Sequence, residues 1–148
     1  MKLGRKTFSI TYTFILVASL FISVAAQAQE TYRARLSPMP TTPQTKDTIT
    51  GEGEVFLTLN GNTLSVSGNY SGMSSVATMA HIHNGPAAQP GPVVAQLVVP
   101  ASTAGEVTAE LELSDELIEA LKNNSLYIQI HSETNAPGEL RGWVFARN

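Results

Sequence analysis

The sequence predicts an all-β fold: an antiparallel Greek-key β-sandwich or barrel of about eight strands with one short helix. Three observations support this prediction. Short segments in which apolar and polar residues alternate recur along the chain, and clusters of Gly, Pro, Asn and Ser separate them. Only the segment that begins at Ser114 carries the signals of a helix. No internal repeat interrupts this pattern, so one domain is expected.

Residues 1–28 are predicted to be a signal peptide, which leaves 29–148 as the folded domain. Three basic residues in the first six precede an apolar run that is densest over 14–26, and Ala26-Gln27-Ala28 has the small-x-small pattern that signal peptidase cleaves. The alternative is an uncleaved anchor, because residues 8–26 are just long enough to span a bilayer. With cleavage after Ala28 we expect a periplasmic or secreted protein without a stable membrane anchor.

Charge and cysteine content exclude several classes of function. Residues 29–148 keep six of the nine Lys and Arg and all twelve Asp and Glu, a net charge of −6. Such a surface disfavours nucleic acid and anionic lipid as partners. The absence of cysteine excludes disulfides, thiol nucleophiles, iron–sulfur clusters and thiolate copper sites. Stability must therefore come from a packed core, which a chain of this length is able to form.

The first half of the domain reads as three strands. The segment 37–46 between the first two is a loop, because its three prolines cannot donate to a ladder. Asn60-Gly61-Asn62 supplies the positive φ angles of a tight hairpin turn, so the second and third strands should pair antiparallel. The predicted strands cover 31–36, 51–59 and 63–70.

The second half contains the remaining strands and the helix. Ser114 is a good N-cap, and Asp115 and Glu116 suit the positive end of a helix dipole, so a short helix should run from there to Asn123-Asn124. The stretch 84–91 is a fixed loop because it holds two glycines and two prolines. The predicted strands cover 76–83, 93–99, 106–113, 127–131 and 139–146.

All three histidines are predicted to lie on the same side of the sheet. His81 and His83 are two residues apart on a strand, so they point to one face while Ile82 points to the other. His131 ends a second strand, on the face opposite to Ile128 and Ile130. If the isoleucines face the core, the three imidazoles meet on the polar side.

This trio is a candidate site for zinc or copper. Two imidazoles at i and i+2 on a strand reach one ion, His131 supplies a third ligand, and Glu139 or Gln129 supplies a fourth ligand or a supporting contact. Three nitrogen ligands with an open position suit either metal. The alternative is that the histidines fasten the proline-rich loop through hydrogen bonds to backbone carbonyls, with no ion.

Glu139 and Arg141 are two residues apart on the predicted closing strand and should share a face. They form an ion pair, or Arg141 bonds loop carbonyls; the functional alternative is that Arg141 recognises an anionic ligand near the histidines. Gly138 and Gly142 are expected to serve backbone geometry rather than binding.

Four motifs in order make the sequence resemble the CHRD domain, the module named after its repeats in chordin. They are Ala80-His81-Ile82-His83-Asn84-Gly85-Pro86, Gly91-Pro92-Val93-Val94, Leu126 to His131, and Pro137-Gly138-Glu139-Leu140-Arg141-Gly142. The resemblance covers about Thr31 to Phe145 and implies an exported β-sandwich domain without an established catalytic activity. A more distant likeness to Cu/Zn superoxide dismutase stops short, because three histidines are too few and no disulfide exists.

These observations predict an exported binding module rather than an enzyme. No Gly-x-Ser-x-Gly motif occurs, and the only aspartates are Asp47 and Asp115. The expected ligand is a metal ion, or a protein or extracellular-matrix partner. The alternative is a copper or zinc metalloenzyme, remotely like superoxide dismutase, that uses the same histidines.

Overall fold

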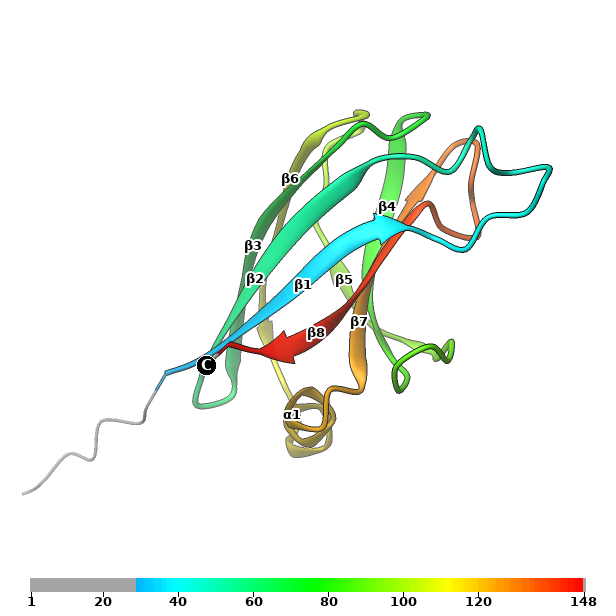
Figure 1. The fold of residues 1–148 in the computed structure, drawn as a ribbon. Helices are drawn as coiled ribbons and strands as arrows, with labels where there is room; N and C mark the ends of the chain where they lie inside the picture. Colours follow the sequence, from blue (N-terminus) through cyan, green and yellow to red (C-terminus); the bar gives the residue numbers. More distant parts are fainter. Residues whose placement is uncertain (1–28, 148) are drawn as a thin grey trace, which may run out of the picture.

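The computed structural model describes residues 29–147, and it confirms the predicted fold class. Eight antiparallel strands form one sheet that curves into a nearly closed barrel (Figure 1), in the order β5-β4-β7-β8-β1-β2-β3-β6. The predicted signal peptide lies outside the described residues. The strands are β1 (Glu30–Pro38), β2 (Glu52–Asn60), β3 (Thr63–Ser71), β4 (Ala77–Asn84), β5 (Val93–Leu97), β6 (Gly105–Glu112), β7 (Leu126–Ser132) and β8 (Leu140–Ala146).

Alternation along the strands builds the core. In β1, for example, Tyr32, Ala34 and Leu36 are buried while Arg33 and Arg35 between them are exposed. Every second residue of a strand faces the same side, so each strand delivers one apolar row to the interior of the barrel. Burial of these rows in the absence of any disulfide supplies the main stabilisation.

The Asn60-Gly61 hairpin forms as the sequence predicts. β2 and β3 pair in register from Glu52↔Ser71 to Asn60↔Thr63, and Gly61 has a φ of +63°. A glycine adopts this left-handed conformation without steric cost, so the turn is as tight as a two-residue loop allows.

The barrel closes through a single bridge between the two edges of the sheet, which are formed by β5 and β6. Val98, just past β5, exchanges two backbone hydrogen bonds with Thr108 of β6, at 2.8 and 3.0 Å. The rest of the β5 and β6 edges are not paired with each other, which makes the closure incomplete.

The one helix in the described part of the chain, α1 (Asp115–Lys122), lies at one end of the barrel (Figure 1). The Ser114 side chain accepts a hydrogen bond from the amide of Leu117 at 3.4 Å, which confirms the predicted N-cap. Leu121 is fully buried and anchors the helix to the barrel. Within residues 29–147, no helix has the length and apolar character needed to cross a membrane.

β1 runs to Pro38, two residues into the predicted loop, and β5 ends at Leu97, two residues before its predicted end. A smaller difference, at the start of β8, bears on the site. The closing strand begins at Leu140 rather than at Glu139, and the β7–β8 ladder ends at the pair Ile130↔Leu140. The bend before it is set by Gly138, whose φ of +131° is one that side chains rarely allow. Glu139 therefore lies in the bend, and alternation along β8 does not decide which way it points.

Candidate metal centre

The three histidines come from β4 and β7, which are neighbours in the sheet (Figure 1). Antiparallel pairing sets His81 opposite Gln129 and His83 opposite Tyr127. The intervening Ile82 is fully buried in the core, as the sequence predicts. The histidines accordingly lie on the outer face of the sheet and not among the core residues.

The imidazole nitrogens converge. One ligand nitrogen from each of His81, His83 and His131 lies within 4.8 Å of the other two. The closest pair is Nδ1 of His81 and Nε2 of His131, which are 3.3 Å apart. Two ligands of a tetrahedral zinc ion, each at about 2.0–2.1 Å from the metal, are themselves about 3.3 Å apart. This pair already has the spacing that a metal requires, and His83 needs only a small inward movement.

Although the cluster is on the outer face, it is mostly covered. His83 and His131 are only 8% and 9% exposed, while His81 is half-buried. The loop 84–92 covers His83, whose Nδ1 lies 2.9 Å from the carbonyl oxygen of Gly91. The bend after β7 covers His131, whose Nδ1 lies 2.7 Å from the carbonyl oxygen of Ala136.

These two carbonyls decide where the lone pairs are. A carbonyl oxygen only accepts, so Nδ1 of both His83 and His131 must carry the proton and donate it. In the neutral rings, Nε2 then holds the lone pair. That of His131 lies 3.3 Å from both Nδ1 of His81 and Nε2 of Gln129, either of which is able to donate to it, whereas that of His83 has no donor. The hydrogen bonds expected of a purely structural histidine are therefore formed, and they also prepare both rings for metal binding, since most metal-bound histidines donate their other N–H in this way.

Among the buried polar side-chain atoms of residues 29–147, the Nε2 atom of His83 is the one that lacks a hydrogen bond. It is inaccessible to solvent and has no hydrogen-bond partner. Leaving such an acceptor unpaired costs about 1–3 kcal/mol. The ring is nevertheless held firmly, because it stacks on Tyr127 with the ring centroids 4.7 Å apart and the planes 10° from parallel.

Burial and repulsion between neighbouring rings favour the neutral forms of His81 and His83. Burial lowers the pKa of His81, and positive charge on His131 and His83 would lower it further. Burial also lowers the pKa of His83; the hydrogen bond to Gly91 opposes this shift, while His131 and Arg141 add to it. Neutral imidazole is the form that binds metals, so the lowered pKa values of His81 and His83 favour coordination.

Gln129 supports the cluster but does not offer it an oxygen. Its Oε1 accepts hydrogen bonds from Nε and Nη2 of Arg141 at 2.8 and 2.6 Å. Its Nε2 donates to the carbonyl of Pro137 at 2.8 Å and lies 3.3 Å from Nε2 of His131. Gln129 thus fills the supporting role that the sequence left open, and it is not placed as a ligand.

Arg141 bonds a side chain rather than the loop carbonyls that the sequence suggested. Its guanidinium carbon lies 4.8 Å from the ring centroid of Tyr127 and 5.8 Å from that of Trp143. Such contacts add cation–π attraction. Trp143 in turn donates to the carbonyl of Gly85 at 3.1 Å, so this aromatic group holds the start of the loop that covers His83.

Glu139 is not grouped with the histidines, and it does not pair with Arg141. Its side chain is fully buried. One carboxylate oxygen accepts from the amides of Ser74 and Thr50, at 2.6 and 3.3 Å. The other accepts from Ser132 and from Asn135, the latter at 3.2 Å. Because Glu139 lies in the bend before β8, its carboxylate turns to the side of Ser132 and away from His131. Its predicted ion pair with Arg141 was wrong for this reason.

Gly138 and Gly142 serve backbone geometry, as expected. A Cβ atom on Gly138 would collide with the sulfur of Met39 and the amide of Gln129, and one on Gly142 would collide with the carbonyl of Arg35 in the neighbouring strand. At both positions other groups approach the backbone too closely for a side chain to fit.

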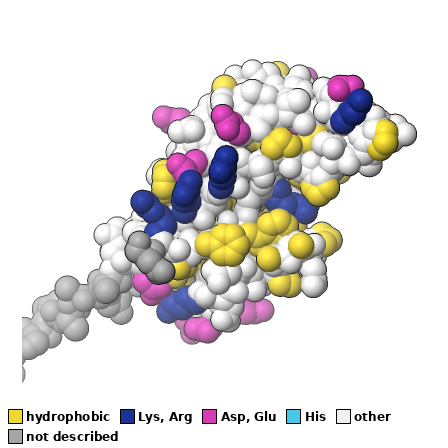
Figure 2. All heavy atoms as spheres, viewed as in Figure 1, with side chains coloured by type: hydrophobic (Ala, Val, Ile, Leu, Met, Phe, Trp, Pro, Cys, Tyr) yellow, Lys and Arg dark blue, Asp and Glu magenta, His cyan; other side chains and the backbone are white. Residues whose placement is uncertain are grey.

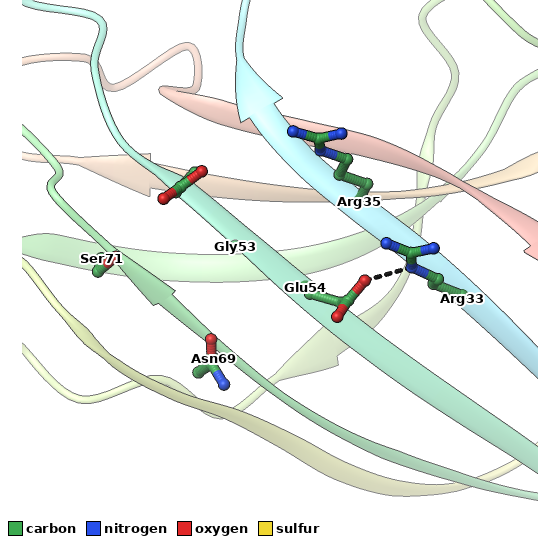
Figure 3. A pocket seen from close by; sticks show the side chains of 7 residues that line it. Arg33, Arg35, Gly53, Glu54, Asn69 and Ser71 are labelled. Atoms are coloured by element: carbon green, nitrogen blue, oxygen red, sulfur yellow. Dashed lines mark ion pairs between the residues drawn. The ribbon is translucent and has the colours of Figure 1, made fainter.

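A separate surface hollow lies on the outer face of β1, β2 and β3, away from the histidines. Figure 2 shows a row of basic side chains with acidic ones among them on this side of the molecule. Arg33 and Glu54 form an ion pair in the hollow, as Figure 3 shows. It is lined by Arg33, Arg35, Glu52, Gly53, Glu54, Asn69 and Ser71, which include no group suited to acid–base catalysis near pH 7.

The comparison with protein families agrees with this geometry. The model of the CHRD domain matches residues 32–144, which is most of the chain. The protein belongs to the CHRD domain family. A search of curated proteins gave no match. The match runs from Tyr32 in β1 to Val144 in β8, so the CHRD domain takes in all eight strands, and the three histidines are part of it.

Sequence reasoning found the three candidate ligands of this CHRD domain but not the groups that orient them. The hydrogen bonds to the carbonyls of Gly91 and Ala136 could not be predicted, because every residue has a backbone carbonyl and no residue type marks these two. The stacking of Tyr127 on His83 left a signal, since Tyr127 lies on the same face as Gln129 and His131.

Proposed function

We propose that this CHRD domain is an exported module that binds one divalent metal ion, zinc or copper, through His81, His83 and His131. The observation that carries the proposal is the buried, unpartnered Nε2 of His83, in a cluster where one nitrogen of each imidazole lies within 4.8 Å of the other two. A metal ion would bind this lone pair and remove the cost of burying an acceptor without a partner. Export rests on the basic and apolar N-terminal pattern that ends at Ala28.

The purely structural alternative does not account for the unpartnered Nε2 of His83. Hydrogen bonds to Gly91 and Ala136 would be enough to hold the covering loops. They do not require that the remaining nitrogens converge on one point from two strands. Three positive imidazoliums would repel one another there, which makes the cluster unfavourable unless the rings are neutral.

Metal content and thermal unfolding test this proposal. Protein stripped of metal with a chelator should bind one equivalent of Zn²⁺ or Cu²⁺ by calorimetry. At a free metal concentration of about 100 times Kd, the gain in stability should be about 2.7 kcal/mol. For a domain of this size that corresponds to a rise in Tm on the order of 10 °C.

The matched variants are His83→Ala and Gln96→Ala. Gln96 lies opposite His81 on β5 and is exposed, so its loss removes a polar side chain near the site without removing a ligand. His83→Ala should abolish the stoichiometric binding, and Gln96→Ala should retain it. Wild-type protein that binds neither ion, with an unchanged Tm, would end the proposal.

The second candidate, a metalloenzyme at the same histidines, is favoured by one observation. Three protein ligands leave a fourth position of a tetrahedral ion free, which is the arrangement of catalytic zinc sites. Turnover would have to be shown with the metal-loaded protein and lost in His83→Ala.

A further inference from the structure

A methionine lies on the same face as the three histidines. Met79 precedes His81 by two residues on β4, so alternation points both side chains outward. It is paired directly with His131 across the β4–β7 ladder, and the next pair, Ala80↔Ile130, is fully buried on the opposite face. β4 therefore carries Met79, His81 and His83 in one row, next to the row that ends at His131.

Met79 lies outside the core and lines an open hollow together with Gln96 and Val98. Its side chain is 44% exposed, although it is one of the larger apolar side chains and would be favoured in the core. Directly opposite residues of an antiparallel pair have Cβ atoms about 4.5–5.5 Å apart. An unbranched side chain with three rotatable bonds readily turns its sulfur from this position toward the ring of its partner.

We propose that Met79 is the fourth ligand of the metal site and that the site thereby selects copper(I). This inference rests on the three-histidine site of the proposed function and changes its preferred ion from a divalent one to copper(I). A thioether is a soft ligand that binds copper(I) well and hard or borderline ions poorly, while imidazole accepts both copper and zinc. The chain has no cysteine, so methionine is its one type of sulfur donor.

The fourth ligand also separates the two candidate functions. A three-histidine site is open to substrate, whereas three histidines and a thioether complete a tetrahedral set. The exposure of Met79 makes it a movable ligand, which covers the ion when it is bound and withdraws to let it enter or leave. Such a site holds and releases copper rather than catalysing a reaction on it.

Two other described methionines are the natural comparisons. Met73 is 5% exposed and belongs to the core. The sulfur of Met39 lies beside Gly138 and the amide of Gln129, on the flank of the cluster where Pro137 and Arg141 hold that amide. Met39→Leu is therefore the matched control for Met79→Leu, because each change replaces one sulfur near the site with a carbon of similar size.

The experiment measures two affinities on the full chain after export. Copper(I) binding is followed without oxygen by competition with a coloured copper(I) chelator, and zinc binding by competition with a fluorescent zinc chelator. Met79→Leu should weaken copper(I) binding at least about tenfold and leave zinc binding within about twofold. Met39→Leu should change neither. X-ray absorption at the copper edge should show a sulfur neighbour in the wild type and in Met39→Leu, but not in Met79→Leu.

The failures of the two proposals are distinguishable. If His83→Ala loses metal but Met79→Leu binds copper(I) as the wild type does, the histidine site stands and the role of Met79 is refuted. A sulfur neighbour that survives in Met79→Leu and disappears in Met39→Leu also refutes it. If wild-type protein binds neither metal, both proposals fail.

Discussion

Replacing the buried carboxylate of Glu139 by an amide should destabilise the fold strongly. Glu139 joins three segments, because its two oxygens accept from Ser74 and Thr50 on one side and from Ser132 and Asn135 on the other. The same bend presents the carbonyls of Ala136 and Pro137 to His131 and Gln129. The substitution Glu139→Gln keeps the volume but turns one acceptor oxygen into a donor.

The magnitude follows from the donors that lose their partner. In the variant, whichever way the amide is turned, two N–H or O–H donors face its NH₂ group. A buried polar group left unpaired costs about 1–3 kcal/mol, and two of them, partly relaxed, cost about 3 kcal/mol. For a domain of this size the Tm should fall by about 10–15 °C.

Thermal unfolding followed by circular dichroism at pH 7 measures this loss. Glu133→Gln is the control, because Glu133 is an exposed glutamate just past β7 and should change the stability by less than about 0.5 kcal/mol. The variant Glu139→Gln should also weaken metal binding, since the bend that orients His131 is loosened.

The pH dependence supplies a second check on Glu139. Burial by itself raises the pKa of this carboxyl, but hydrogen bonds from Ser132, Ser74 and Thr50 outweigh burial and hold the pKa below its ordinary value of 4.5. The ionised form therefore stabilises the fold above about pH 4.5, and this contribution is lost as the pH falls through the lowered pKa. The difference between wild type and Glu139→Gln should shrink at low pH. A difference below about 0.5 kcal/mol at pH 7 would refute the reasoning.

Two further predictions concern the site and its frame. Burial lowers the pKa of His81 and His83 below 6.5, so protons should not compete with the metal for these rings until the pH falls below that value. Metal affinity, measured by chelator competition, should therefore be constant from pH 8 to 6.5 and decrease at lower pH. A decrease that begins between pH 8 and 7 would contradict this. The change Gly138→Ala forces a side chain into a φ of +131° and against Met39, so it should lower the free energy of unfolding in urea by about 2 kcal/mol or more. At Gly72, whose φ is +70° but whose Cβ would be in ordinary contact, alanine should cost only about 1 kcal/mol, and equal losses at the two glycines would argue against the crowding at Gly138.

The strands could be read from the sequence because their causes are local. A period of two in apolar residues fixes which side chains share a face, and this holds for Tyr32 in β1 and Val144 in β8. It fails at the start of β4, where the register shifts between Ala77 and Met79. The Asn60-Gly61 turn and the Ser114 cap depend on residues only a few positions apart. The same parity places His81, His83 and His131 on one side of the sheet, so the candidate ligands were within reach of sequence reasoning.

Met79 carries the same local signal as the histidines. It has the same parity as His81 and His83, and the row of alternate residues is visible in the printed sequence. What alternation does not provide is the partner across the ladder, because the pairing of Met79 with His131 depends on a register between segments about fifty residues apart.

Only the tertiary structure decides three features of the site: the burial of the outer face, the tautomers of the histidines and the direction of the Glu139 side chain. The face that alternation marks as polar is covered by the loop 84–92 and by the bend before β8, so two of its histidines are almost as inaccessible as core residues. Glu139 turns away from them because the ladder stops at Leu140. These features arise from contacts between backbone and side-chain atoms far apart in the chain, and local patterns carry no information about them.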